Sequence, residues 1–342
     1  MNPFTPTAAT SIASLGERGV IAAIRRWLGS ACPQSPFGIG DDCAVVPASK
    51  NPQGPHLLTV DPVIYGQHFD DSVSPGAAGA KLFKRNLSDI AAMGGRPRAA
   101  VVALAIDPAV SIRWLEQFYR GLARVSRAYA VPLVGGDVAQ LSGGIVATLT
   151  LMGEAGTPGR RILTRDGARP GDWICVTGHL GGSLKSHHWK FTPRLAEGAW
   201  LASRPEVVAM MDVSDGLAKD LDALAPARSL IRLDPAEIPL SRDAFHAARA
   251  SGQPALAHAL SDGEDYELAF VIRAKTDFAA FAQAWHQVFP RVRLSRIGRF
   301  FDRSMARRIP AAWIDLEPYR GFEHLRPASS VQHRTPKRSG RR

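Results

Sequence analysis

Long hydrophobic runs and paired cysteines are both scarce in this sequence. The longest apolar stretches, such as Ala99–Ile106 (AAVVALAI), are far shorter than the roughly 20 residues of a membrane-spanning helix. No N-terminal apolar stretch is long enough for a signal peptide. The three cysteines, Cys32, Cys43 and Cys175, are not spaced like metal ligands. We therefore expect no membrane association, reduced thiols and a cytoplasmic location.

The common nucleotide-binding and nucleophile motifs are also missing. The sequence has no GxxxxGK[ST] loop, and the nearest string, GHLGGSLKS at residues 178–186, lacks the Gly-Lys step. The loop GIGDDC at residues 38–43 lacks the third glycine of a dinucleotide-binding fingerprint. Neither an HRD and DFG pair nor a GxSxG elbow occurs. Any nucleotide chemistry must therefore rest on other residues.

Positive charge is abundant, with a formal net charge of +11. Residues 332–342 (QHRTPKRSGRR) carry much of this excess without apolar periodicity, which is typical of a disordered basic tail. The other arginines are scattered and form no basic stripe interleaved with aromatic residues. We expect no specific nucleic-acid partner, and anionic small molecules fit the charge equally well.

The chain is long enough for about two domains, since one domain commonly takes ~150 residues. Strand and helix patterns mix in both halves, which predicts an α/β or α+β fold. The stretch AAGAKLFKRNLSDIAAM (77–93) predicts a helix that Gly94 and Gly95 end. Around residues 156–170 the composition turns to Gly, Pro and Arg, so we place a boundary there. The expected parts are residues 1–155, residues 156–326 and a tail at residues 327–342.

Aspartates recur where apolar strands or helices meet glycine turns. Asp42 follows a glycine loop, Asp61 closes LLTVD, and Asp137 ends a short strand at a Gly-Gly-Asp loop. The others are Asp41, Asp89, Asp212 and Asp215. A single aspartate in such a place is usually a cap or turn residue. Several of them inside apolar sequence instead predict partial burial around a shared site.

Carboxylates that crowd together repel one another unless cations neutralise them. Hard oxygen ligands with few histidines nearby favour Mg²⁺ over Zn²⁺, and Mg²⁺ on carboxylates usually serves phosphate chemistry. Two like charges ~4 Å apart cost ~4 kcal/mol at an effective dielectric of ~20, and two phosphates bring several such pairs together. We therefore expect several Mg²⁺ ions. The pair His187-His188 is interpreted as a solvated loop.

Seven motifs give the sequence a family resemblance from about Phe37 to Phe322. It resembles the thiamine-monophosphate kinase family, within the aminoimidazole-ribonucleotide-synthetase-like superfamily, because these strings occur in the family's order: GIGDDCAVV, TVDPVIYGQHF, NLSDIAAMGGRPRA, LVGGD, LTRDGARPGDWICVTG, MDVSDGLAKDL and SDGEDYELAF. The resemblance implies ATP-dependent phosphorylation of thiamine monophosphate to thiamine diphosphate. It also implies a two-domain α/β fold whose N-terminal domains pair in a homodimer to build a β-barrel.

The resemblance also implies residue roles. The Mg²⁺ ligands would be Asp42, Thr59, Asp61, Asp89, Asp137, Asp212 and Asp215. The ATP contacts would be Tyr119, Gly136, Asp137, Arg165 and Ser214, and the thiamine contacts would be His68, Glu264 and Phe322. Phosphoryl transfer depends mainly on positioning and charge neutralisation, and the attacking phosphate oxygen is already anionic. We therefore expect no dedicated general base.

The chain departs from the family pattern at several points. Val60 stands where the family usually has a hydroxyl residue between Thr59 and Asp61. GGDVAQL (135–141) lacks two hydroxyls and an arginine of the usual loop, and TGHLGGS (177–183) lacks an acidic residue. The stretch between Ser183 and Pro193 is shorter than expected. These departures concern the substrate and the rate more than the fold.

Two other functions compete with this kinase activity. The first is another ATP-using member of the superfamily, such as an aminoimidazole-ribonucleotide synthetase, a selenophosphate synthetase or a hydrogenase-maturation protein. A selenophosphate synthetase needs a reactive cysteine or selenocysteine, and Cys32 lacks the lysine and glycines expected beside one. The second is a nucleotide- or nucleic-acid-binding protein without catalysis, against which the retained aspartates argue.

Overall fold

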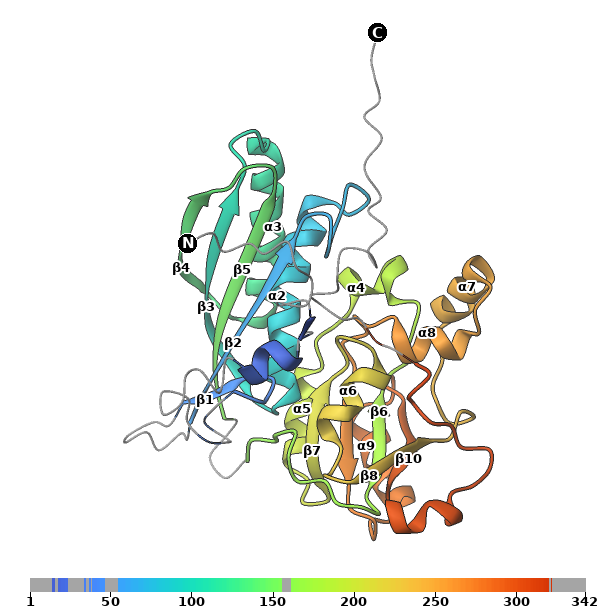
Figure 1. Ribbon diagram of the computed structural model, residues 1–342. Helices are drawn as coiled ribbons and strands as arrows, with labels where there is room; N and C mark the ends of the chain where they lie inside the picture. The colour runs from blue at the N-terminus through green and yellow to red at the C-terminus, as the bar shows by residue number, and fades with distance from the viewer. Residues whose placement is uncertain are drawn as a thin grey trace. The chain divides into compact units, whose positions relative to one another are not determined.

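Two five-stranded sheets organise the chain (Figure 1). The computed structural model describes residues 14–15, 18–23, 34, 37, 39–46, 55–155, 161–319 and 321. Both sheets belong to one unit, residues 34–321. No helix within the described ranges is long and apolar enough to cross a bilayer. Cys43 and Cys175 are free, buried thiols, and Cys32 lies outside the described residues.

The first sheet has the strand order β1-β2-β5-β3-β4. Its neighbouring strands are antiparallel except for the parallel pair β3 and β4. Helices α2 (Pro75–Ala92) and α3 (Ile112–Tyr129) bury their apolar residues in the same core as the inward residues of this sheet. The strands are β1 (Ala44–Val46), β2 (His56–Ile64), β3 (Arg96–Ile106), β4 (Leu133–Gln140) and β5 (Ile145–Glu154).

The second sheet has the order β7-β9-β6-β10-β8, and all of its pairs are antiparallel. Its central strands are buried on both sides, with β9 (LAFVI) buried at every position, as expected of a sheet covered on both faces. The strands are β6 (Trp173–Thr177), β7 (Val207–Asp212), β8 (Ser229–Leu233), β9 (Leu268–Ile272) and β10 (Leu294–Asp302). The helices are η4 (Ser183–Lys185), α4 (His187–Lys190), α5 (Leu195–Ala202), α6 (Leu217–Leu224), α7 (Arg242–Ser251), α8 (Ala255–Ser261), α9 (Phe278–Val288) and η5 (Arg303–Arg308).

Helix α2 packs against both halves of the chain. The side chain of Ser74 caps the N-terminus of α2, and Pro75 lies in its first turn. Just after the C-terminus, Gly94 has a left-handed backbone with φ +67. A Cβ added at Gly79 would collide with the backbone of α3, and one at Gly198 of α5 would collide with the backbone of α2. The two glycines therefore allow α2 to approach a helix of each half closely.

The mixed α/β fold predicted from the sequence is confirmed, as is the helix ending at Gly94 and Gly95. The prediction that Asp137 lies in a Gly-Gly-Asp loop was wrong, because Asp137 lies inside β4. Parallel pairing with β3 continues to Gln140, and Gly136 lets the chain pass close to the backbone of Val102. Over the residues that the structure describes, the first sheet of one chain is open, with β1 and β4 at its edges. The boundary at residues 155 and 156 stays a prediction.

Candidate functional site

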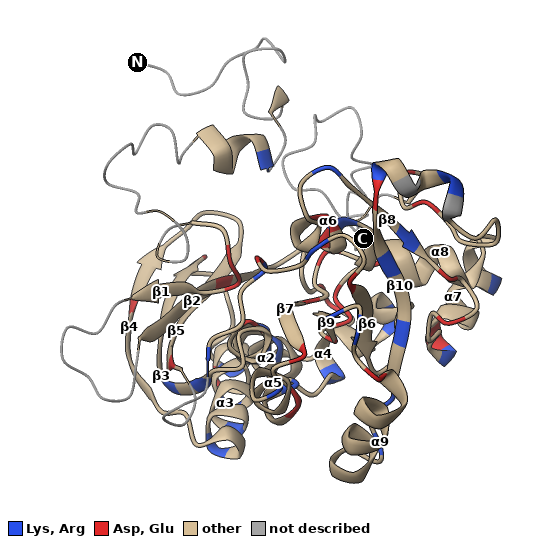
Figure 2. Cartoon of the chain, turned by 90° about the horizontal axis from the view of Figure 1, so that it is seen from below, with Lys and Arg blue, Asp and Glu red and all other residues tan. Residues whose placement is uncertain are grey.

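Three carboxylates, those of Asp42, Asp89 and Asp212, form a cluster at the C-terminal end of α2. Each offers an oxygen that lies within 4.8 Å of the other two. Asp42 precedes β1, Asp89 lies near the end of α2, and Asp212 ends β7. Acidic residues at the centre of Figure 2 come from both halves of the chain. The fold thus brings together three aspartates from motifs that are up to 170 residues apart (212 − 42).

Burial, and after it the neighbouring carboxylates, raise the pKa values of Asp89 and Asp212 in this cluster. Burial, then the charge of Asp42, raises the pKa of Asp212 to about 8. Burial, then Asp61 and Asp212, raises the pKa of Asp89 well above its ordinary value. Both effects disfavour the ionised form, and a cation placed between the oxygens would reverse them. The donor set, three carboxylates in reach of one point, therefore suits a hard divalent cation.

Asp41 and Asp42 have different partners, although they are adjacent. The guanidinium of Arg165 forks onto Asp42, with Nε–Oδ2 and Nη2–Oδ1 distances of 3.1 Å each. Asp41 instead accepts a hydrogen bond from the backbone amide of Arg165 at 2.6 Å. Asp41 thus fixes the backbone beside the cluster, whereas Asp42 faces it. Arg165, expected at the nucleotide, stands beside the first metal motif.

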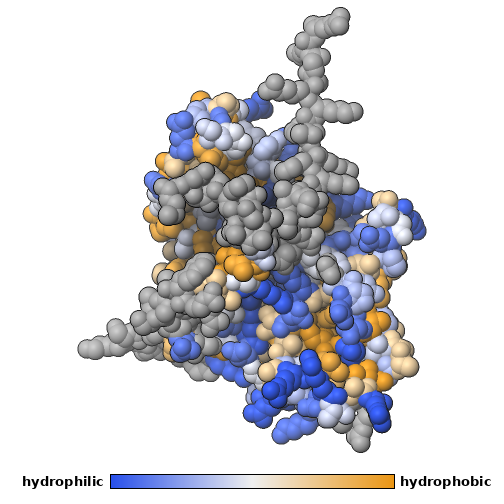
Figure 3. Space-filling model, viewed as in Figure 1, coloured by the Kyte–Doolittle hydropathy of each residue, from blue (hydrophilic) through white to orange (hydrophobic). Residues whose placement is uncertain are grey.

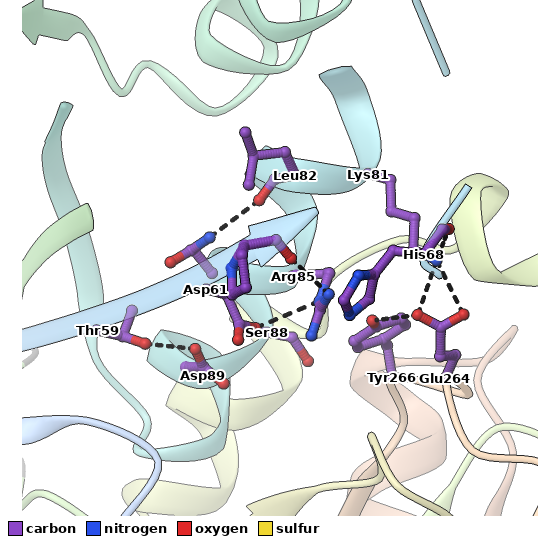
Figure 4. Close-up of polar contacts among 12 residues, drawn as sticks. Thr59, Asp61, His68, Lys81, Leu82, Arg85, Ser88, Asp89, Glu264 and Tyr266 are labelled. Carbon is purple, nitrogen blue, oxygen red and sulfur yellow. Dashed lines mark hydrogen bonds and ion pairs between the residues drawn. The ribbon is translucent and has the colours of Figure 1, made fainter. Parts of the chain in front are cut away.

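Strand β2 adds hydroxyl and carboxylate groups to the same area. Thr59 Oγ1 donates to Asp89 Oδ2 at 2.5 Å, and Asp61 Oδ2 lies 3.4 Å from the Nε of Arg85 (Figure 4). Residues alternate between faces along a strand, so Val60, with 58% of its surface exposed, points the other way. The hydroxyl missing at Val60 would therefore lie on the face away from the carboxylates.

The residues expected to contact ATP lie in three places. Tyr119, Gly136 and Asp137 line one cavity of about 330 Å³ beside β3 and β4. Arg165 stands at Asp42, as described above. Ser214 lies in the turn after β7, where its amide and that of the next residue donate to Asp220 at 3.0 and 3.1 Å.

Two of the aspartates expected as metal ligands lie apart from the cluster in the part of the chain that the structure describes. Asp137 is exposed on β4. Asp215 pairs with Lys219, with an Oδ2–Nζ distance of 2.8 Å. Among the described residues, the three-carboxylate cluster consists of Asp42, Asp89 and Asp212, so the sequence motifs converge only in part.

A second cavity, of about 180 Å³, lies at the other end of the site. His68 and Glu264, the two described residues expected at the thiamine group, both line it. Phe322, the third, lies outside the described residues. Two further lining residues, His188 and Trp189, were not predicted. The cavity therefore brings together segments around residues 68, 188 and 264, which are far apart in sequence.

The prediction of a solvated pair was wrong for His188, which is only 7% exposed. Its Nδ1 lies 2.6 Å from the Nζ of Lys81 and 3.3 Å from the carboxylate of Glu264. Burial, then the charge of Lys81, lowers the pKa of His188 to about 4, so its imidazole is neutral at pH 7. The aromatic residues Trp189 and Phe191 beside the pair were the available signal for burial.

Lys81 holds this end of the site together. Its fully buried Nζ lies 2.7 Å from Oε1 and 2.9 Å from Oε2 of Glu264, and donates to the carbonyl of His68 at 2.7 Å (Figure 4). Burial lowers the pKa of Lys81 to about 8. Glu264 has a left-handed backbone, with φ +54, which is uncommon for a residue other than glycine. The helical pattern places Lys81 on the polar side of α2, so its burial could not be predicted from the sequence.

Comparisons with known proteins add four likenesses. Residues 40–155 match the model of the AIR synthase related protein, N-terminal domain. Thiamine-monophosphate kinase of Rhodopirellula baltica is 34% identical over 300 residues, which cover 85% of this chain and 92% of that protein. Thiamine-monophosphate kinase of Escherichia coli K12 is 35% identical over 280 residues, which cover 75% and 82%. A solved structure, AaThiL complexed with AMPPCP and TMP, matches with a TM-score of 0.76 at 28% identity, covering 93% of this chain and 100% of that one.

Proposed function

Because the chain belongs to the thiamine-monophosphate kinase family, we propose that it uses ATP to phosphorylate thiamine monophosphate, giving thiamine diphosphate. The observation that carries this proposal is the three-carboxylate cluster at one end of α2, with a separate cavity at the other end. A related structure is described as complexed with AMPPCP and TMP, an ATP analogue and the phosphate acceptor. Two binding sites at the two ends of one helix would suit a direct transfer between the phosphates of ATP and thiamine monophosphate.

The reaction joins an oxygen of the acceptor phosphate to the γ-phosphorus of ATP. The bond between that phosphorus and the β,γ-bridging oxygen breaks, and ADP leaves. No proton has to be removed from the attacking oxygen, because it is already anionic. The residues therefore have to orient two anions and offset their repulsion, which is the main demand of phosphoryl transfer.

The chemistry of the cluster fits Mg²⁺. Asp42, Asp89 and Asp212 would hold it, because their oxygens converge and the pKa values of Asp89 and Asp212 are raised by burial and mutual repulsion. When bound, Mg²⁺ supplies positive charge that neutralises the phosphates and draws them together. Further ions would bind at Thr59, Asp61, Asp137 and Asp215.

The nucleotide would lie toward β4 and the turn after β7. We assign its contacts to Tyr119, Gly136 and Asp137, which share a cavity, and to Arg165 and Ser214. Arg165 already forks onto the carboxylate of Asp42, and the same fork geometry suits a phosphate. Its place beside Asp42 would put a fixed positive charge next to the polyphosphate.

The thiamine group would occupy the cavity of about 180 Å³ that His68 and Glu264 line. The Glu264 carboxylate is already paired with Lys81, which fixes its orientation before the substrate arrives. Phe322 is proposed as a further contact. The phosphate of the substrate would lie outside this cavity, toward α2.

We further propose a homodimer built on the first sheet. The outward face of this sheet exposes Leu58, Val60, Val101 and Met152, and apolar area of this kind is a common interaction surface. These residues share a face, because Leu58 pairs with Met152 while Val60 and Val101 both pair with Thr150. Hydrophobic residues reach the surface on the left of Figure 3, where Figure 1 shows β3 and β4. Two such sheets would build the expected barrel.

The remaining organisation is proposed from the sequence. A nucleotide-binding and dimerisation domain would span residues 1–155, a C-terminal domain residues 156–326, and a basic tail residues 327–342. The two sheets fall on either side of the proposed boundary, with β5 ending at Glu154 and β6 beginning at Trp173. The protein is proposed to act in the cytoplasm.

The function is tested by incubating the purified chain with ATP, MgCl₂ and thiamine monophosphate and measuring thiamine diphosphate by chromatography. We expect product that depends on both substrates, and its loss when EDTA replaces MgCl₂. Thiamine without its phosphate is the matched control acceptor and should give no diphosphate. Intact ATP binding without product at high enzyme concentration would contradict the proposal. It would favour another reaction of the same superfamily.

A further inference from the structure

One face of helix α2 connects the two ends of the site. Counted from Lys81, three of the polar residues that follow lie four, seven and eight positions later, at Arg85, Ser88 and Asp89. These spacings place the four side chains on one side of the helix. Lys81 contacts Glu264 at the thiamine cavity, and Ser88 donates to Asp212 at the cluster with a 2.6 Å bond. At a rise of 1.5 Å per residue, Arg85 lies roughly 6 Å from both Lys81 and Asp89 along the axis. Figure 4 shows its side chain between the two ends.

The Arg85 side chain is largely buried, with 11% of it exposed. Its Nη1 donates to the carbonyl of Pro62 at 2.7 Å, and its Nε lies 3.4 Å from Asp61 Oδ2. Among the described residues, the buried Nε has no hydrogen-bond partner. A guanidinium carries five N–H donors, so one hydrogen bond and one long ion pair leave capacity for an anion. A buried cation with unused donors is costly unless a ligand uses them.

We propose that Arg85 binds the phosphate of thiamine monophosphate, an inference that rests on the proposed function. The acceptor phosphate has to lie between the thiamine cavity and the γ-phosphate held at the carboxylate cluster, and Arg85 stands midway between these places. The carboxylates around it, at Asp61, Asp89 and Glu264, would each repel a phosphate. Arg85 gives this stretch of the site a donor whose fork matches phosphate geometry.

Arg85 acts in this proposal by position and charge alone. Its guanidinium stays protonated throughout. It donates hydrogen bonds to those phosphate oxygens of thiamine monophosphate that do not attack. The attacking oxygen forms its bond to the γ-phosphorus, and ADP leaves, as described above. The hydrogen bond that Arg85 donates to the carbonyl of Pro62 fixes the guanidinium plane, which would hold the acceptor phosphate at one angle to the cluster.

The test compares the dissociation constants of thiamine monophosphate and thiamine by calorimetry, with AMPPCP and MgCl₂ present. The variants are Arg85→Met, which keeps the length of the side chain without its charge, and Arg85→Lys. We expect Arg85→Met to weaken thiamine monophosphate binding by about 10- to 100-fold, as for loss of a charge-assisted hydrogen bond, and thiamine binding by less than about 2-fold. Arg85→Lys should give an intermediate loss, because it keeps the charge but not the fork.

The control is Arg120→Met, since the Arg120 side chain is 66% exposed on α3, and it should change neither constant. An unchanged preference for the phosphorylated ligand in Arg85→Met would overturn the proposal. Tighter Mg²⁺ binding in Arg85→Met, with the preference for thiamine monophosphate over thiamine unchanged, would also overturn the proposal. The role of Arg85 would then be only to neutralise Asp61. If Arg85→Met does not fold, full preference in Arg85→Lys overturns it. A wild-type chain that binds the two ligands equally would instead contradict the proposed function itself.

Discussion

The two ends of helix α2 solve the problem of buried charge in opposite ways. At the Asp89 end, three carboxylates converge, and the pKa values of two of them are raised by burial and mutual repulsion. At the Lys81 end, the carboxylate of Glu264 is paired within the protein by a buried ammonium group, and a neutral His188 completes the contact. At the Asp89 end one guanidinium, that of Arg165 on Asp42, accompanies three carboxylates, whereas at the Lys81 end one ammonium group pairs with one carboxylate.

This difference separates the tasks of the two ends. A set of carboxylates that is unfavourable alone gains stability from a bound cation, so the Asp89 end is suited to a ligand that brings metal with it. The Lys81 end is already satisfied and rigid, which suits recognition of an organic group by shape and hydrogen bonds. Four changes would break or sharpen this contrast.

The largest effect is expected from Asp212→Asn at the carboxylate end. Product formation should fall by at least about 10³-fold, because a metal ligand contributes several kcal/mol to charge stabilisation and each ~1.4 kcal/mol is a tenfold in rate. In EDTA the variant should melt at a higher temperature than the wild type, since a repelling carboxylate has been removed. The increase in Tm that MgCl₂ gives the wild type should be lost.

Asp222→Asn, an exposed aspartate on α6, is the matched control for Asp212→Asn and should leave turnover and the Mg²⁺ effect unchanged. Turnover close to that of the wild type in Asp212→Asn would show that the cluster does not serve the reaction.

At the other end, Lys81→Met should act mainly on stability and on the acceptor. Removing one partner of a largely buried ion pair costs about 3–5 kcal/mol in unfolding free energy, of which we expect the lower part because Glu264 is partly exposed. Urea unfolding measures the loss, and the KM for thiamine monophosphate should rise more than that for ATP. The double variant Lys81→Met with Glu264→Gln should recover part of the stability. Additive losses in this cycle would show that the pair is not coupled.

His188 should make the Lys81 end sensitive to acid. Its pKa is about 4 in the folded protein and ~6.5 when unfolded, so the unfolded state binds the extra proton between these values. The folded protein is therefore favoured above pH 6.5 and loses about 2 kcal/mol between pH 7 and pH 5. His188→Gln should lack this part of the pH dependence in urea unfolding. An equal loss in both proteins would place the acid sensitivity at other groups.

The smallest effect is expected from Val60→Thr, which restores a hydroxyl found in the family pattern. Val60 faces away from the carboxylates, so turnover should change by less than about 2-fold. A tenfold rise in turnover would show that this residue does reach the metals. The measurement is the same chromatographic assay.

The carboxylate end was easier to predict than the Lys81 end. Asp42, Asp89 and Asp212 each sit in a recognisable local motif, so the sequence places them at a common site without knowledge of their contacts. Lys81 and Glu264 are 183 residues apart, and helical periodicity places Lys81 on the polar side of α2 without showing that Glu264 covers it. His188 was misread because two adjacent histidines look solvated until a partner 107 residues away covers one of them.

The Gly-Gly-Asp stretch was misread for a related reason. Glycine and aspartate are typical of turns, yet pairing with β3 keeps Asp137 in an extended strand. Tertiary pairing, which local composition does not report, decided this element. The departure at Val60 shows the opposite case, since strand alternation alone would have placed its side chain on the outer face.

Helix α2 also sets a fixed distance between the two ends of the site. Because it is one uninterrupted helix from Pro75 to Ala92, the axial distance from Lys81 to Asp89 is fixed at about 12 Å, and no hinge within it can adjust that length. An acceptor that places its phosphate much nearer to or farther from its ring would reach past or fall short of the carboxylates. The length of the helix segment thus selects the acceptor by reach, independently of how well its ring fits the cavity.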